Sequence, residues 1–317
     1  MSQNSIGKQQ GAAPCVATIG FFDGVHRGHK FLIKSVIDRA AEYGLQSAVI
    51  TFDRHPRLVL HKEFQPRLLT TNDEKLRLLA ATGVNRCEML RFDEQTASLS
   101  AYDFMKTVLR GRLNVRRLIT GYDNRFGHNR AEGFDDYVRY GQELGIEVER
   151  SEAFVLNGVN VSSSVVRSFL SAGETDMASM CLGYHYKIGG TVVSGYHEGR
   201  KLGFPTANID VEDKLKLVPE AGVYAVRVRI GDEPGLLDGM MNIGTRPTFD
   251  GTETTLEVNI FGFGGDIYGR KITVEFHRRL REERKFGSVY KLMDQLKADR
   301  EEACRVLADE RRVENKE

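Results

Sequence analysis

Apolar and polar residues follow two different patterns along this chain. From residue 14 to about 150, short apolar runs alternate with stretches of helical spacing. Strands that are apolar throughout and are separated by helices are typical of a parallel sheet covered on both faces. The predicted strands lie at 15–20, 46–52, 87–92, 115–123 and 146–154, and the predicted helices at 29–44, 72–83, 101–113, 134–145, 162–173 and 175–183. We therefore expect an α/β domain.

After about residue 184 the pattern changes to runs rich in strand-forming residues, and Gly, Pro and Asp turns separate them. Such runs suggest an antiparallel barrel or sandwich. They lie at 186–196, 222–232, 236–244, 254–263 and 271–280. A charged helix is expected at about 287–312. Its apolar stripe of Leu292, Leu296, Cys304 and Leu307 is expected to pack on the barrel, with a coiled-coil dimer as the alternative. The change of pattern predicts two domains, at 14–183 and 184–317.

Composition narrows the class of protein. The 317 residues include 45 Lys and Arg against 44 Asp and Glu, a net charge of +1, which does not favour a nucleic-acid binder. The four cysteines are far apart in the sequence, which predicts reduced thiols in a cytoplasmic protein. Residues 1–13 are polar, and no apolar run approaches the roughly 18 residues of a membrane span. We therefore expect neither a signal peptide nor a membrane partner.

Two histidines surround one glycine directly after the first predicted strand, in GFFDGVHRGH (20–29). The carboxyl ends of parallel strands border the ligand site of such sheets, and the start of the next helix favours anions. His26 and His29 can both donate hydrogen bonds to one phosphate group there. Capping or surface histidines would give the same short pattern. A metal site would need a third ligand at a usual spacing, which does not follow.

The string resembles the H-x-G-H signature of the nucleotidyltransferase superfamily, and more narrowly that of the bacterial bifunctional riboflavin kinase/FMN adenylyltransferase (FAD synthetase) family. Further stretches resemble segments of the same family, in the same order. They are TFDRHPR (51–57), LLTTNDEKLRLL (68–79), GYDNRFGHNRAEG (121–133) and VSSSVVRSFLSAGETDMASMCLG (161–183). The resemblance implies that this half transfers AMP from ATP to FMN, giving FAD and pyrophosphate.

The resemblance also implies roles for single residues. His26 and His29 would be catalytic, and His55 would contact the flavin, although a turn histidine before Pro56 fits the sequence nearly as well. Arg167 would reach the β- and γ-phosphates, with a surface helix arginine as the alternative. The other expected ATP and phosphate contacts in this half are Gly20, Asp23, Gly24, Asp123, Ser162, Ser163 and Ser164.

This sequence departs from the family pattern at three places. Phe21 stands where the family has Asn, which removes a polar side chain near the nucleotide. Asn124 replaces a Phe after Asp123. Asp53 and Arg54 precede His55, where the family has a Pro.

The strongest motif is GRKLGFPTANID (199–210). Pro205 fixes one backbone angle and Gly203 frees another, which predicts a shaped loop. Thr206 and Asn208 then present two oxygen ligands of the kind that Mg²⁺ takes together with substrate phosphates. A turn in which both side chains bond local backbone is the alternative.

The longer string resembles the riboflavin kinase signature, and companions at 192–203, 222–228, 240–249 and 256–286 extend the resemblance over nearly the whole second half. It implies transfer of the γ-phosphoryl group of ATP to riboflavin. Thr206 and Asn208 would then bind Mg²⁺, and Glu257 would be the catalytic base, with Glu275 as the second candidate. The expected phosphate contacts are Gly199, Lys201 and Gly203, and the expected flavin contacts are Arg281 and Phe286.

The sequence thus predicts an enzyme whose partners are riboflavin, FMN, FAD and ATP. Two alternatives stay open at this point. In the first alternative, only the kinase half is active, because Phe21 departs from the family pattern. In the second, the chain is a regulatory protein that binds flavin without catalysing a reaction. Retention of Glu257, Thr206, Asn208, His26 and His29 argues against the second. The sequence does not determine the oligomeric state.

Overall fold

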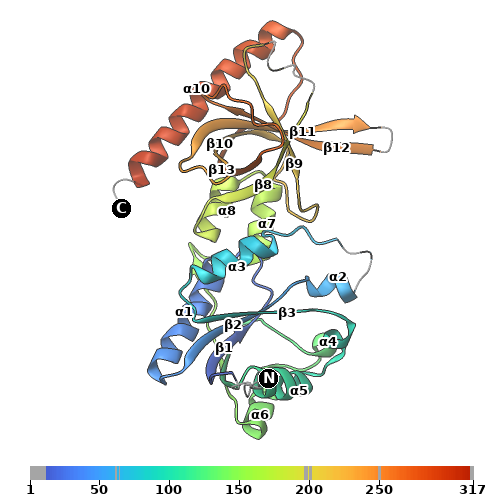
Figure 1. Cartoon of the computed structure of the whole chain (residues 1–317), viewed down its shortest axis with the longest axis vertical. Coiled ribbons are helices and arrows are strands. Elements are labelled where there is room, and N and C mark those ends of the chain that lie inside the picture. Colours follow the sequence, from blue (N-terminus) through green and yellow to red (C-terminus); the bar gives the residue numbers. More distant parts are fainter. Residues whose placement is uncertain are drawn as a thin grey trace, which may run out of the picture. The chain divides into compact units, whose positions relative to one another are not determined.

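The computed structural model describes residues 12–60, 63, 65–195, 199, 202–248 and 251–314. The chain forms two compact units (Figure 1). The first contains Met1–Pro66 and Thr70–Val161, and the second contains Arg67–Leu69 and Ser162–Glu317. The polar tail predicted at residues 1–13 lies, up to residue 11, outside the described residues.

The first unit is built on a five-stranded sheet. Its strands are β1 (Cys15–Ile19), β2 (Gln46–Phe52), β3 (Arg86–Leu90), β4 (Val115–Thr120) and β5 (Glu147–Arg150). Their order is β3-β2-β1-β4-β5, and every neighbouring pair is parallel. The predicted parallel sheet is therefore confirmed, with each strand within a few residues of its expected position.

Side chains of successive strand residues point to opposite faces, so a strand that is apolar throughout supplies two cores. In β1, Cys15, Ala17 and Ile19 belong to one core and Val16 to the other. The first core contains residues of α5 (Ala101–Asp103), the π-helix η1 (Phe104–Arg112) and α6 (Phe134–Leu144). The second contains residues of α1 (Arg27–Glu42) and α3 (Asn72–Ala80). Helices therefore cover both faces (Figure 1).

Several short elements differ from the prediction. The helix expected at 101–113 is divided into α5 and the π-helix η1. The wider turns of η1 end at Leu113, whose N–H donates to the carbonyl oxygen of Val108. A hairpin of β6 (Val155–Leu156) and β7 (Val159–Asn160) turns through Asn157 and Gly158, both of positive φ. Asn-Gly is the usual sequence of such a turn. The other short elements are α2 (Pro56–Leu60), α4 (Glu94–Ser98) and the 3₁₀ turn η2 (His128–Arg130).

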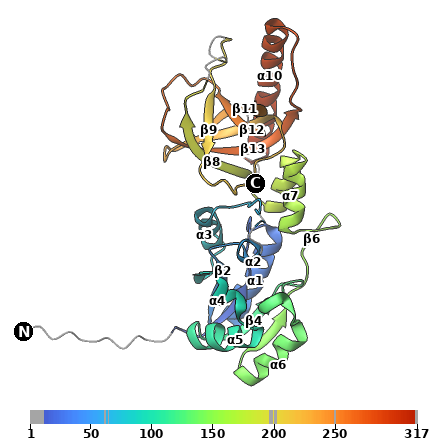
Figure 2. The same ribbon diagram turned by 90° about the vertical axis from the view of Figure 1, so that its right-hand side faces the viewer.

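The second unit begins with α7 (Ser163–Ser171) and α8 (Thr175–Leu182) and continues into a closed antiparallel barrel (Figure 2). The barrel strands follow the order β10-β11-β12-β9-β8-β13. They are β8 (Tyr186–Val193), β9 (Ala207–Val211), β10 (Gly222–Ile230), β11 (Leu237–Thr248), β12 (Gly251–Ile260) and β13 (Lys271–Arg281). Of the two antiparallel architectures suggested by the sequence, the structure has the barrel.

The segment at 199–210 is only partly the predicted loop. Its last four residues belong to β9, which pairs with β8 on one side and with β12 on the other. Asn and Asp disfavour strands, so local preference gave no strand here. Pairing with both neighbours overrides that preference, because β9 is needed to close the barrel.

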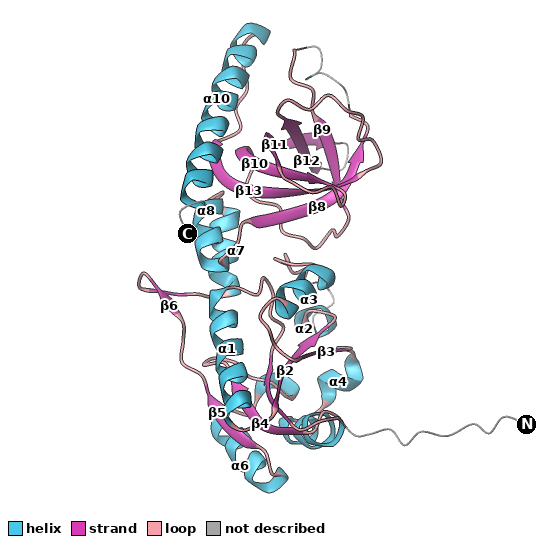
Figure 3. Ribbon diagram, turned by 60° about the vertical axis from the view of Figure 1, so that its left-hand side comes forward, coloured by secondary structure: helices cyan, strands magenta, loops and turns pink. Residues whose placement is uncertain are grey.

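The terminal helix α10 (Val289–Glu314) packs against the barrel, as expected (Figure 3). Its buried apolar residues are Ala303, Val306 and Leu307, which form a core with residues of β10 and β11. The expected stripe was partly wrong, because Cys304 is exposed. Residues 303, 306 and 307 have the i, i+3, i+4 spacing of one helix face, and Cys304 lies off that face.

Candidate active sites

The loop between β1 and α1 has an unusual backbone. Phe22, Gly24 and Val25 have φ angles of 54°, 79° and 36°, in the left-handed region that residues other than glycine rarely adopt. Phe22 and Val25 are nevertheless buried in the core under α1. Burial of these two side chains holds the loop in its shape, and strain of this kind is commonly found at functional sites.

The two histidines lie together at the start of α1. His26 is the N-cap residue, and its Nδ1 accepts a hydrogen bond of 3.2 Å from the backbone N–H of His29. The two rings are stacked with centroids 3.6 Å apart. Because Nδ1 of His26 acts as an acceptor, Nε2 carries the proton of the neutral ring and is a donor. The capping interpretation is thus correct for His26 and is compatible with phosphate binding.

Buried contacts fix the loop that carries these histidines. The Asp23 carboxylate is 3% exposed and accepts hydrogen bonds from the backbone and hydroxyl of Thr70. The same hydroxyl accepts from the backbone N–H of Gly24. A Cβ on Gly28 would lie 2.9 Å from the carbonyl oxygen of Val161. Asp23 therefore supports the loop in this structure, and its contact with ATP stays a prediction. The contact of Gly20 with ATP also stays a prediction. A Cβ at Gly20 would meet the Phe22 ring at 3.1 Å.

Phe21, the first departure from the family pattern, is enclosed by two other side chains. Its ring meets His55 edge-on at a centroid distance of 4.9 Å, and Nζ of Lys75 lies 4.1 Å from the ring centroid. His55 Nδ1 also accepts from the backbone N–H of Arg57, as the turn interpretation expected. The flavin role of His55 stays a prediction.

Lys75 was not predicted from the sequence as a residue of this region. It is 1% exposed, and its Nζ donates to the carbonyl oxygen of Phe52 at 2.7 Å. Burial lowers the pKa of Lys75 to about 8, against the opposing influence of nearby Asp23. The sequence does contain a signal for the burial of Lys75. This residue lies four positions before the buried Leu79, and that spacing puts both side chains on one helix face.

The loop after β4 meets the loop after β1. The Asn124 side chain donates a hydrogen bond to the carbonyl oxygen of Ile19. β1 and β4 are the neighbours at which the strand order reverses, which is where open α/β sheets bind ligands. Asp123 is exposed there. It borders a pocket of about 250 Å³ whose other lining residues are Thr120, Tyr122, Asn124, Arg125, Phe134 and Arg150.

The serines and the arginine expected to bind phosphate lie on α7, in the second unit. Ser162 is the N-cap and accepts a hydrogen bond from the backbone N–H of Val165. Ser163 and Ser164 form the first turn. Nε of Arg167 donates to the carbonyl oxygen of Arg67 at 2.8 Å. Their contacts with ATP phosphates stay predictions.

Three oxygen-bearing side chains lie close together where β9 meets β12. Asn208 lies on β9, and Thr206 directly precedes that strand. Asn208 pairs directly with Glu257 across the two strands, and the Thr206 hydroxyl lies 3.3 Å from a carboxylate oxygen of Glu257. All three are half-buried. The structure thus brings together the expected metal ligands and the expected base.

This group has the chemistry that Mg²⁺ requires. Hydroxyl, amide and carboxylate oxygens are its preferred protein ligands, and it normally takes few of them, together with water and substrate phosphates. Gly199 lies beside the group, because a Cβ there would be 3.3 Å from the Thr206 hydroxyl and 2.3 Å from the carbonyl oxygen of Phe204. The residues present therefore suit a magnesium–ATP complex.

The remaining barrel residues have other partners or lie elsewhere. Gly203 has a φ of 80° in an exposed turn, and Lys201 lies outside the described residues. Arg281 forms a bidentate pair with Asp299 of α10, and its guanidinium lies 5.6 Å from the Phe286 ring centroid. Flavin contacts of Arg281 and Phe286 stay predictions.

Glu275, the second candidate for the base, is bound elsewhere. Its carboxylate accepts from Nζ of Lys187 at 2.6 Å, and the residue is 7% exposed. It lies on β13, whereas Thr206 and Asn208 face β12. Glu257 is therefore the carboxylate placed beside the expected metal ligands.

A small pocket of about 80 Å³ beside Thr206 includes Asp266, which the sequence analysis did not single out. Asp266 follows β12 in a Gly-rich loop, and only the folding of that loop onto the barrel brings it near Thr206.

Comparison with known proteins divides the chain between two family models. The FAD synthetase family model matches residues 8–165, and the riboflavin kinase family model matches residues 182–307. In the part of the chain that the structure describes, no helix is long and apolar enough to cross a membrane.

Similar proteins cover nearly the whole chain. The bifunctional riboflavin kinase/FMN adenylyltransferase of Pseudomonas fluorescens is 40% identical over 299 residues, 93% of each chain. That of Bacillus subtilis is 34% identical over 307 residues, 95% of each. A Streptococcus pneumoniae crystal structure, named as a macrolide-efflux protein, has a TM-score of 0.84 at 33% identity and covers 93% of this chain and 94% of its own. The chain therefore belongs to the family of bifunctional riboflavin kinase/FMN adenylyltransferases.

Proposed function

We propose that this chain converts riboflavin to FMN and FMN to FAD, each step at its own site and each with ATP. The observation that carries the proposal is the meeting of Glu257 with Thr206 and Asn208 across β12 and β9. A proton acceptor close to two magnesium-type ligands is what phosphoryl transfer to a hydroxyl needs.

In the barrel, the terminal ribityl hydroxyl of riboflavin attacks the γ-phosphorus of ATP. A new O–P bond forms, the bond between the γ-phosphorus and the bridging oxygen breaks, and ADP leaves. Glu257 accepts the hydroxyl proton. Thr206 and Asn208 would hold Mg²⁺, which would neutralise phosphate charge. Gly199, Lys201 and Gly203 border the phosphates, and Arg281 and Phe286 contact the flavin.

In the first unit, a phosphate oxygen of FMN attacks the α-phosphorus of ATP. The bond from the α-phosphorus to the bridging oxygen breaks, and pyrophosphate leaves. The attacking phosphate is already an anion, so the protein positions the groups and stabilises charge rather than removing a proton. His26 and His29 donate to ATP phosphates at the start of α1, where free N–H groups also favour anions. Ser162, Ser163, Ser164 and Arg167 add further contacts.

A single incubation tests both steps. Purified full-length protein with riboflavin, ATP and Mg²⁺ is sampled over time, and flavins are separated by chromatography. We expect FMN to appear first and then to convert to FAD. FMN that accumulates without FAD would limit the activity to the barrel, and no flavin product would overturn the proposal in favour of a flavin-binding protein.

Two carboxylate variants make the assay specific to the proposed base. Glu257→Gln should lower the rate of FMN formation by about 10²–10⁴, the usual contribution of a general base. It should leave FAD formation from added FMN unchanged. The matched variant Glu275→Gln loses only the pair with Lys187 and should keep most of the kinase activity. Equal loss in both variants would contradict the role of Glu257.

We also infer that the protein works in the cytoplasm, where ATP is available. The four cysteines support this inference, because all are free thiols in the structure.

A further inference from the structure

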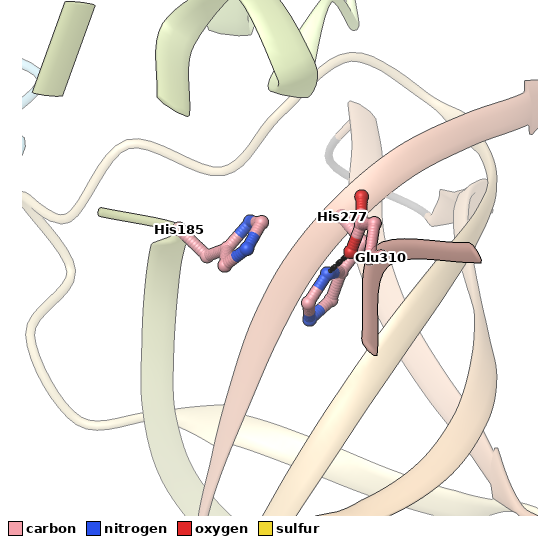
Figure 4. A group of neighbouring side chains, drawn as sticks. All are labelled: His185, His277 and Glu310. Carbon is pink, nitrogen blue, oxygen red and sulfur yellow. Dashed lines mark hydrogen bonds and ion pairs between the residues drawn. The ribbon is translucent and has the colours of Figure 1, made fainter. Parts of the chain in front are cut away.

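Three metal-ligating side chains lie together in the second unit, on segments other than β9 and β12. His185 directly precedes β8, His277 lies on β13 and Glu310 lies near the end of α10. One ligand atom from each, an imidazole nitrogen or a carboxylate oxygen, lies within 4.8 Å of the other two. Figure 4 shows the His185 ring facing His277, which is joined to the Glu310 carboxylate.

The three side chains are in contact and largely shielded from water. The His185 and His277 ring centroids are 3.9 Å apart, and Nδ1 of His277 bonds to the carboxylate of Glu310. His277 is completely buried, and its Nε2 makes no hydrogen bond within the part of the chain that the structure describes. Only one of its two nitrogens is therefore engaged, and the ring can adjust to bind an ion.

The charge of Arg227 also acts on Glu310. The guanidinium of Arg227 donates to the carbonyl oxygen of Leu307 and lies 3.9 Å from the carboxylate of Asp238. Asp238 also pairs with Arg311. Burial raises the pKa of Glu310, but its hydrogen bond with His277 and the charges of His277, His185 and Arg227 outweigh burial and lower it.

We propose that His185, His277 and Glu310 bind one divalent transition-metal ion of the zinc class. Two imidazole nitrogens and one carboxylate oxygen are a frequent three-ligand set for zinc, with water as the fourth ligand. Magnesium prefers oxygen ligands and does not suit this group. Metal–ligand bonds of about 2.1 Å in a tetrahedron separate ligand atoms by roughly 3.4 Å, so side-chain shifts of about 1 Å complete the site.

Binding replaces the contact between His277 and Glu310 with one bond from each to the ion. The ion links the entry to β8, the strand β13 and the end of α10, which are far apart in the sequence. Because the unfolded chain does not hold these ligands together, metal binding stabilises the folded unit. This role is independent of the proposed catalytic residues.

Equilibrium dialysis of chelator-treated full-length protein against Zn²⁺, followed by metal analysis, tests the proposal. The variants are His185→Gln, a His26→Gln/His29→Gln pair, and His128→Gln as the matched control. His185 is half-buried, so its variant is expected to fold, which circular dichroism verifies. His128 lies exposed in the first unit. Cobalt in place of zinc gives a visible absorption band that reports the ligand geometry.

We expect the wild type to retain one more zinc per chain than His185→Gln, in the presence of excess Mg²⁺. The His128 variant should retain as much as the wild type, and zinc should raise the unfolding temperature of the wild type but not of His185→Gln. Equal zinc content in the wild type and His185→Gln overturns the proposal. Loss of zinc only in the His26/His29 variant also overturns it, because the ion would then bind at the start of α1.

Discussion

The buried lysine beneath Phe21 gives a prediction whose size follows from the structure. Lys75 is 1% exposed, and burial lowers its pKa from 10.5 to about 8. Above about pH 8 the folded protein holds this amine neutral, while the unfolded chain stays protonated up to about pH 10.5. The unfolded state therefore binds more protons in this window, and the free energy of unfolding rises with pH.

The size of the effect follows from the shift. At pH 7 the charged amine costs the folded state about 3 kcal/mol, since each pKa unit corresponds to about 1.4 kcal/mol. By about pH 9.5 much of that cost is gone, so the free energy of unfolding of the first unit gains about 2 kcal/mol from Lys75. Asp23, Asp53 and Cys87 are the other titratable groups that act on this amine, and they remain in the variants described next.

The assay is urea unfolding of the wild type and Lys75→Met, followed by far-ultraviolet circular dichroism at about pH 7 and about pH 9.5. We expect the difference between the two proteins to change by about 2 kcal/mol between these pH values, because only the wild type has the titrating amine. Lys34→Met is the matched control, because the Lys34 side chain is 73% exposed on α1. A Lys75→Met curve that rises with pH as steeply as the wild type would refute the reasoning.

Two further substitutions test the packing around each site. Gly28→Ala places a Cβ 2.9 Å from the carbonyl oxygen of Val161, so α1 must shift. We expect the free energy of unfolding to fall by about 1–3 kcal/mol. The rate of FAD formation should fall at least tenfold, while FMN formation is retained. Gly133→Ala, where a Cβ meets nothing within 4 Å, should cost much less in the same activity assay. Asp299→Ala leaves the Arg281 guanidinium without its bidentate partner and should destabilise the second unit by about 3 kcal/mol in thermal unfolding. An unchanged melting temperature would show that this pair does not hold α10 to the barrel.

The sequence determined the features that depend on short stretches of chain. The apolar strands and their helices appeared from spacing alone, because burial on two faces imposes a pattern that neighbouring residues must follow. The His26 and His29 pair was found in the same way, since both lie within one turn of the same helix. Thr206 and Asn208 were recognised as a pair, although the strand that contains Asn208 was not, because pairing with β8 and β12 decides its conformation.

Only the tertiary structure determined which distant residues meet. Asn124 bonds to Ile19 across the point where the strand order reverses, and Lys75 lies beneath Phe21. Glu257 was placed between two motifs by resemblance, but its position opposite Asn208 follows from the register of β12 and β9. No local pattern connects His185, His277 and Glu310 either, because three separate segments bring them together. Strand register and helix packing are set by contacts between distant segments, whereas periodicity and capping reflect interactions within a few residues, and this difference in range separates what the sequence showed from what the fold decided.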